Sequence, residues 1–201
     1  MTRLADQWAR LLSWCDANAP VTAAGLNPPA EPQTVRDAEI ATGTTWTPEL
    51  REWFALHNGS DHGRAFPQVL PGYRPMTLAE LVRDWRSLVG IWAGPTTEME
   101  KIEGRRLLAD PAGTTAFTYV SSYIPIAADS TRCRLVVDTR DGDDAGCVVG
   151  FASDDGVDEG TMRWPSIGAM LQDVADSLET NRPCKGWVPY VEDSELYWDF
   201  P

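Results

Sequence analysis

Carboxylates are the most abundant chemical side chains in this sequence, and many of them fall in two short polar stretches. The acids of these stretches are Asp141, Asp143, Asp144, Asp154, Asp155, Asp158 and Glu159. With Asp138 just upstream, oxygen ligands of this kind can hold a hard cation such as Ca²⁺. The first stretch lacks the ligand spacing of an EF-hand loop and its terminal bidentate Glu. A solvated hairpin tip, whose charge opposes edge aggregation, is therefore the favoured interpretation.

Histidine and cysteine add little further chemistry. His57 and His62 are the only histidines and the four cysteines contain no C-x-x-C pair, so no zinc site is expected. His57 ends an apolar helical stripe, where a packed histidine is favoured over a catalytic one. Cys133 and Cys147 can face each other across a predicted hairpin. A disulfide fits that spacing, but buried free thiols are favoured because no export signal precedes them.

The motifs of common enzyme classes are absent. The sequence has no G-x-G-x-x-G, no P-loop, no H-E-x-x-H and no G-x-S-x-G. A glycosidase-like pair of carboxylates is open to any acidic protein, but no specific pair stands out here. The sequence therefore predicts a protein that is not an enzyme and has no catalytic residue, metal or cofactor. A carboxylate-based hydrolase remains a minor alternative.

Charge narrows the choice of partners. The chain has 17 Lys and Arg against 30 Asp and Glu, a net charge of −13. This surplus argues against nucleic acid and anionic membranes as direct partners, because both attract clustered basic side chains. It permits a basic protein partner. No signal peptide or long apolar run is visible, so a cytoplasmic location is expected.

Apolar residues at spacings of three and four predict the helices that position these side chains. The predicted helices run from Leu4 to Ala17, Gln33 to Thr42, Thr47 to His57, Thr77 to Trp92, and from Ser166 to before Pro183. Thr77 and Glu80 form a capping box, and Asn58-Gly59 is expected to end the third helix in a left-handed turn. Residues 20–32 contain four prolines and are expected to form an extended connector.

Short β-branched or aromatic segments between turn residues predict strands. They are Thr115–Val120, Tyr123–Ala127, Arg134–Asp138, Cys147–Phe151, Trp187–Val191 and Leu196–Trp198. Because consecutive strands lack intervening helices, the fold class is α+β, with a central, largely antiparallel sheet of about six strands packed by helices. Residues 93–114 are read either as a polar helix or as an excursion. One domain is expected over residues 1–201, with 1–30 as an N-terminal helix and connector.

Several motifs, taken in order, resemble the SMI1/KNR4 family of the SUKH superfamily in its bacterial members. The N-terminal motifs are Ala38-Glu39-Ile40, Gly43, Pro48-Glu49-Leu50 and Phe54-Ala55-Leu56-His57-Asn58-Gly59. The later ones are Leu70-Pro71-Gly72-Tyr73-Arg74, Leu78-Ala79-Glu80, Trp85, Tyr123-Ile124-Pro125-Ile126-Ala127, Leu135-Val136-Val137-Asp138 and the hairpin Gly186-Trp187 to Glu195-Leu196-Tyr197-Trp198. The resemblance covers residues 31–201.

The resemblance implies an α+β fold without catalytic residues or a cofactor. It also implies an immunity protein that binds and neutralises a toxin domain, often a nuclease, of a polymorphic toxin system. The alternative is a scaffold or regulatory interaction protein, like the fungal relatives. A basic toxin face would meet the seven loop acids, and Asp61 and His62 are weaker contact candidates. The resemblance names neither the partner nor the oligomeric state.

Overall fold

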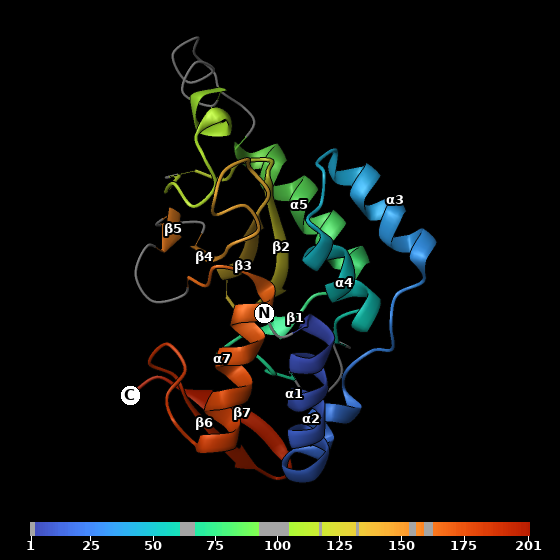
Figure 1. Cartoon of the computed structure of the whole chain (residues 1–201), viewed down its shortest axis with the longest axis vertical. Coiled ribbons are helices and arrows are strands. Elements are labelled where there is room, and N and C mark those ends of the chain that lie inside the picture. Colours follow the sequence, from blue (N-terminus) through green and yellow to red (C-terminus); the bar gives the residue numbers. More distant parts are fainter. Residues whose placement is uncertain are drawn as a thin grey trace.

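A computed structural model describes residues 3–60, 67–92, 105–116, 118–131, 133–152, 156–158 and 163–201 (Figure 1). The helices are α1 (Leu4–Asn18), α2 (Pro20–Ala24), α3 (Pro32–Thr42), α4 (Pro48–Leu56), α5 (Leu78–Trp92) and α7 (Ile167–Thr180), with one more helical turn at residues 105–109. All five predicted helices are confirmed. The predicted connector at residues 20–32 is only partly extended, because Pro20 opens the short helix α2.

Side-chain caps explain where the helices begin. Thr47 Oγ1 accepts a hydrogen bond from the amide of Leu50 at 3.2 Å, just before Pro48 opens α4. The predicted capping box at α5 is present: the Glu80 amide donates to Thr77 Oγ1 at 3.2 Å, and the Thr77 amide donates to Glu80 Oε2 at 2.9 Å. Each cap satisfies amides that the first helical turn leaves unpaired.

The strands form two antiparallel sheets. The main sheet has the order β1-β2-β3-β4-β5, in which β1 (Arg74–Pro75) contributes only two residues beside the four strands β2 (Tyr123–Ala128), β3 (Cys133–Asp138), β4 (Val148–Ala152) and β5 (Gly156–Asp158). A separate hairpin pairs β6 (Val188–Glu192) with β7 (Glu195–Asp199). The α+β class with antiparallel strands is confirmed, whereas the single sheet of about six strands is wrong. Strand patterns identify strands but not their partners.

The predicted strand Thr115–Val120 is also wrong. Residues 115, 116 and 118–120 form no strand, although Ala116, Tyr119 and Val120 are buried. Their side chains pack with Phe151 and Val149 of β4 instead of pairing along the sheet. The apolar pattern of this segment reflects burial of its side chains and not strand pairing, so the pattern alone predicted a strand incorrectly.

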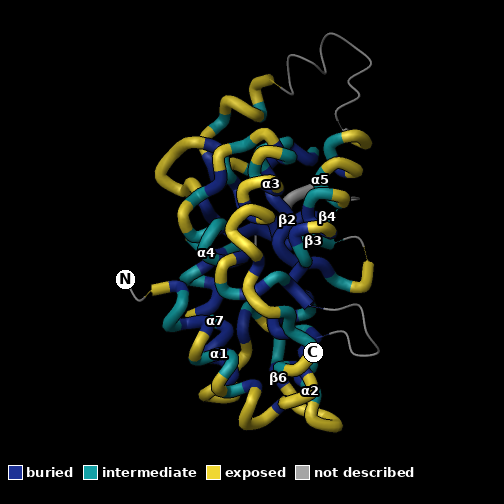
Figure 2. Tube along the Cα trace, turned by 90° about the vertical axis from the view of Figure 1, so that its right-hand side faces the viewer, coloured by how far each residue is buried: buried dark blue, intermediate teal, exposed yellow. Residues whose placement is uncertain are grey.

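Both faces of the main sheet are covered, because side chains alternate between two cores. Ile124, Val137 and Val148 point into the larger core with α1, α4 and α7. Val136 and Val149, on the opposite face, pack with the Leu88 side chain of α5. The sheet strands appear accordingly as buried segments inside a rim of exposed helix surface (Figure 2).

Helix α1 is part of this core and not an appendage to it. Leu4, Trp8, Leu11 and Cys15 are buried along one face of α1, and they belong to the same cluster as Leu171 and Val174 of α7. At the surface between the two helices, Arg10 pairs with Glu179 at 2.6 Å and with Asp176 at 2.8 Å. Helix α1 therefore forms part of the larger core together with α7.

Candidate protein-binding surface

The β3–β4 connection begins with a buried ion pair. Asp138, the last residue of β3, and Arg140 are each 1% exposed at the side chain, and their Oδ2 and Nη2 atoms are 2.8 Å apart. Arg140 also donates to the carbonyls of Leu107 and Thr114, at 2.9 Å and 2.6 Å, while the Gly113 amide donates to Asp138 Oδ2 at 2.8 Å. Burial opposes the charged form of Arg140, but its hydrogen bonds with Asp138 raise the pKa above the ordinary value.

This network gives Asp138 a structural role. Its carboxylate is occupied by Arg140 and by the Gly113 amide, and it holds the loop before β2 against the end of β3. A hydrolase that used Asp138 as acid or base would need this buried carboxylate to reach a substrate. In the described structure the Asp138 side chain is only 1% exposed and is hydrogen-bonded within the protein.

The predicted contact acids Asp141, Asp143 and Asp144 are exposed at the tip of the β3–β4 connection. Asp144 forms an ion pair with Arg163, so its charge is partly compensated. The main chain is tied down as well, because the Ala112 amide donates to the Asp141 carbonyl at 2.8 Å. The tip thus presents Asp141 and Asp143, whose carboxylates have no cationic partner among the described residues, on a well-anchored loop.

Most of the other predicted contact residues, Asp61, His62, Asp154, Asp155 and Glu159, lie outside the described residues. Asp158 is the last residue of β5, opposite Gly150, and only its backbone is described. Ala152 pairs with Gly156, so β4 connects to β5 at its Ala152 end. The β3–β4 connection joins β4 at the other end, at Val148.

The Asn58-Gly59 dipeptide lies beyond the end of α4 and contacts the start of α5, which differs from its predicted role as the stop of α4. Helix α4 ends at Leu56, and His57 is already extended with φ −162°. Asn58 Oδ1 accepts from the amide of Leu78 at 2.9 Å, which caps the start of α5. Gly59 has φ +70°, and a Cβ there would lie 2.4 Å from the main chain of Met76. Only glycine fits here, where the main chain at residue 59 passes close to the main chain of Met76.

His57 is a packed core residue, as the sequence favoured. Its ring stacks on Trp8 with centroids 4.3 Å apart and meets the edge of Trp53 at 4.1 Å. The Gly59 amide donates to Nδ1 at 2.9 Å, so the neutral ring carries its proton on Nε2. Burial lowers the pKa of His57 to about 3.

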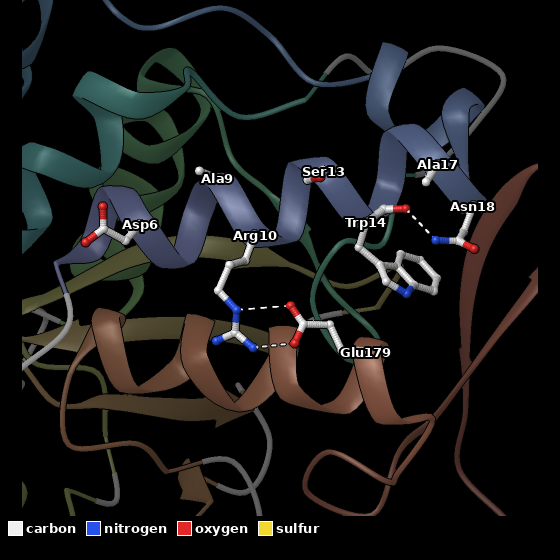
Figure 3. Close-up of a pocket in the computed structure, with 8 residues that line it drawn as sticks. All are labelled: Asp6, Ala9, Arg10, Ser13, Trp14, Ala17, Asn18 and Glu179. Atoms are coloured by element: carbon white, nitrogen blue, oxygen red, sulfur yellow. Dashed lines mark hydrogen bonds and ion pairs between the residues drawn. The ribbon is translucent and has the colours of Figure 1, made fainter.

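An open groove of about 580 Å³ runs along α1 and is lined by Asp6, Ala9, Arg10, Ser13, Trp14, Ala17, Asn18 and Glu179 (Figure 3). Its only cation, Arg10, donates hydrogen bonds to Glu179, Asp176 and Gln7. The hydrogen bonds to Glu179 and Asp176 raise the Arg10 pKa. Trp14 lies near the end of the groove and its carbonyl accepts from Asn18 at 2.9 Å. The groove has no histidine or cysteine and no free carboxylate pair, so it carries no evident acid–base or nucleophilic chemistry.

The β6–β7 hairpin presents a surface that the sequence did not single out. Its inner side is anchored: Leu196 is 1% exposed, and Trp198 Nε1 donates to the Gln68 carbonyl at 2.8 Å. Helix α2 holds the same hairpin, because the Leu196 amide donates to Thr22 Oγ1 at 2.8 Å. By the alternation of the strands, the opposite side carries Tyr190, Glu192, Glu195, Tyr197 and Asp199. These five residues are called the hairpin face below.

Two tyrosines form the centre of the hairpin face. Tyr190 and Tyr197 are cross-strand partners, and their rings stack with centroids 5.5 Å apart and an interplanar angle of 22°. Tyr190 remains 46% exposed. Tyr197 Oη donates to Glu195 Oε2 at 2.7 Å, and this hydrogen bond raises the pKa of Tyr197 to about 12.

Carboxylates surround this tyrosine pair, and no cation of the described residues compensates them. Glu192 and Glu195 are direct cross-strand partners, an arrangement in which like charges repel. None of Glu192, Glu195 and Asp199 forms an ion pair with a residue in the described part of the chain. Residues 186–201 contain no Lys, Arg or His. The hairpin face is therefore an aromatic centre with a negative rim.

Comparison with known proteins adds no family assignment, since no family model and no curated protein matches the chain. The resemblance to the SMI1/KNR4 family consequently stays a prediction. Within the described ranges, no group of three or more His, Cys, Asp or Glu side chains is arranged to hold a metal ion. None of the helices described there is both long and apolar enough to cross a membrane.

All four cysteines carry free thiols. Cys133 pairs with Ala152 at one end of the β3–β4 ladder, whereas Cys147 adjoins the Val137–Val148 pair at the other. At about 3.4 Å per residue, the strands keep these two cysteines too far apart for a disulfide.

Proposed function

We propose that this protein is a non-enzymatic binding module for a basic protein surface, and that it acts as an immunity protein which neutralises a toxin domain by occlusion. The proposal is carried by the hairpin face, where two stacked tyrosines lie among carboxylates that have no cationic partner in the described part of the chain. Exposed aromatic rings are frequent anchors of protein interfaces, and a charged rim steers the partner and selects against like-charged ones.

The disposition of the polar residues supports binding over catalysis. Asp138 and Arg140 neutralise each other inside the protein, and Arg74 and Glu80 form a second buried pair at 2.7 Å. The exposed acids Asp141 and Asp143 form a second, separate negative surface at the tip of the β3–β4 connection. A nuclease-like toxin domain, shaped to hold nucleic acid, has the opposite charge. The resemblance of residues 31–201 to SMI1/KNR4 proteins points to the same role.

Coexpression with toxin domains encoded nearby tests the proposal. We expect the wild-type chain to restore growth against one such domain and to bind it more weakly as salt rises, because screening reduces attraction between exposed charges. Failure to rescue growth against every neighbouring toxin, or binding that strengthens with salt, would contradict it.

The rival function is a scaffold or regulatory interaction protein that has no toxin partner. The same hairpin face would serve such a protein equally well, so surface chemistry does not separate the two functions. Gene context does. An isolated gene without toxin-like neighbours, together with recovery of an unrelated protein by affinity purification, would favour the scaffold.

A further inference from the structure

We propose that the hairpin face binds arginine side chains displayed by a basic partner protein, with a guanidinium stacked on Tyr190 and paired to Glu192. This inference rests on the proposed function, because it identifies the surface and the partner side chain that a binding module of this kind uses. It concerns residues that belong to neither of the acidic stretches singled out in the sequence.

The ring of Tyr190 is available for stacking. Tyr197 covers one side of this ring from the neighbouring strand, at a centroid distance of 5.5 Å. Strand β6 pairs only with β7 in the described structure, so the other side of the ring faces the unpaired edge of the hairpin. A cation placed over a tyrosine face is attracted by the ring quadrupole. Arginine is better suited to this contact than lysine, because its planar guanidinium stacks on a ring while its edge donates hydrogen bonds.

Carboxylates are placed to take those hydrogen bonds. Glu192 lies two residues along β6 from Tyr190, on the same side of the strand, and its side chain has no hydrogen-bond or ion-pair partner among the described residues. Glu195 lies directly opposite Glu192, and one of its oxygens accepts from Tyr197. A guanidinium between the two carboxylates would relieve their cross-strand repulsion and would form charge-assisted hydrogen bonds.

The hairpin is held rigidly enough to present this surface before binding. Trp198 and Leu196 anchor its inner side in the larger core, and the Val21 amide of α2 donates to the Ser194 carbonyl at 3.1 Å. A preorganised surface loses less entropy on binding than a mobile one.

Figure 1 shows the hairpin at one end of the molecule, with the helical turn at residues 105–109 at the other. The Arg140 side chain ties that turn to the β3–β4 connection. The hairpin face and the tip that carries Asp141 and Asp143 are therefore distant from each other.

This separation allows a charge-matched experiment. The test pair of substitutions is Glu192→Gln with Glu195→Gln, and the control pair is Asp141→Asn with Asp143→Asn. Each pair changes the net charge from −13 to −11. The probe is a short acetylated peptide in which Arg and Thr alternate, compared with the same peptide carrying Lys or Gln at the Arg positions. Amide NMR titration of the full chain measures the dissociation constant and identifies the strands that respond.

We expect the arginine peptide to perturb β6 and β7 and to bind more tightly than the lysine peptide. The substitutions in the hairpin face should weaken this binding about tenfold, as should Tyr190→Leu, whereas the control pair should weaken it less than about twofold. Equal weakening by the two pairs would show attraction to net charge alone and would overturn the inference. Equal affinity for the arginine and lysine peptides would also overturn it.

The outcome can be separated from that of the proposed function. If the wild-type chain rescues growth from a toxin and the hairpin-face variants rescue it equally well, this inference is wrong and the immunity function remains. Peptide binding at β6 and β7 without rescue by any toxin would remove the immunity function and leave the arginine-binding surface. Circular dichroism and thermal unfolding of each variant verify that the fold is retained.

Discussion

Asp138 and Arg140 face each other two residues apart in sequence, each 1% exposed at the side chain, with their charged atoms 2.8 Å apart. Arg140 continues from this pair to Tyr123, whose hydroxyl accepts from Nη2 at 3.2 Å. The pair therefore ties β3, β2 and the segment at residues 107–114 together. Its stability contribution comes from the completeness of these hydrogen bonds, because a buried charge without them is costly.

We predict that Asp138→Asn destabilises the protein by about 3 kcal/mol, since it leaves the buried guanidinium without its counter-charge. Urea unfolding at neutral pH measures the loss. Asp143→Asn, on the exposed tip of the same connection, is the matched control and should change stability by less than about 0.5 kcal/mol. An Asp138→Asn protein as stable as the wild type would show that the ion pair is dispensable.

Gly59 and Gly43 provide a second comparison, because both have left-handed backbone angles, φ +70° and +64°. An added Cβ at Gly59 would meet the main chain of Met76 and Thr77 at 2.4 Å, whereas nothing lies within 4 Å of one at Gly43. Gly43→Ala should therefore cost about 1 kcal/mol from backbone strain alone. Gly59→Ala should cost at least about 3 kcal/mol, because main chain cannot move aside as a side chain can. Similar losses in thermal unfolding for the two variants would contradict the steric explanation.

The turn of the β6–β7 hairpin gives a stabilising prediction. Asp193 and Ser194 both have positive φ, 49° and 65°, as a two-residue type I′ turn requires. Aspartate tolerates this conformation better than serine does. Ser194→Gly should raise stability by about 0.5 kcal/mol, because the strain at this position exceeds the entropy cost of glycine. The Ser194 carbonyl that accepts from Val21 remains in the variant.

Ser194→Ala is the control for that substitution, since alanine also lacks the hydroxyl but pays the same backbone strain. It should leave the melting temperature unchanged or slightly lower it. A rise in melting temperature for alanine equal to that for glycine would assign the gain to loss of the hydroxyl instead.

The sequence predicted what depends on local chemistry. Thr77 and Glu80 located the start of α5, and apolar spacing located α1 and α7, because caps and amphipathic stripes act within a few residues. It did not predict that β6 and β7 leave the main sheet. That choice depends on packing between Trp198 and the chain around Gln68, more than a hundred residues away in sequence.

The hairpin face was missed for a related reason. The acids that cluster in loops, Asp141, Asp143 and the second acidic stretch, predict a charged surface, whereas Glu192 falls between the predicted strands Trp187–Val191 and Leu196–Trp198. The usable signal was the alternation of tyrosine and acid on the two paired strands, Tyr190 with Glu192 and Tyr197 with Glu195. Period-two spacing places such residues on one face, but only the observed register makes the two tyrosines partners.

His57 gives a prediction about pH. Its pKa in the folded protein, about 3, lies below the ordinary value of 6.5 because the ring is buried between Trp8 and Trp53. As pH falls through about 6.5, His57 therefore becomes protonated in the unfolded chain but stays neutral in the folded one. The free energy of unfolding is retained above that pH and decreases below it. Between about pH 7.5 and pH 5, where most carboxylates stay ionised, this group should account for a loss of about 2 kcal/mol.

Urea unfolding across that interval, repeated for two substitutions, isolates the contribution. His57→Phe keeps a ring to stack on Trp8 but loses the acceptor for the Gly59 amide, so its stability at neutral pH should be lower. Its dependence on pH, however, should be flatter than that of the wild type. His62→Gln removes the only other histidine and should keep the wild-type slope. If His57→Phe kept that slope, the destabilisation by acid would have to come from carboxylates, and the buried histidine would not be its cause.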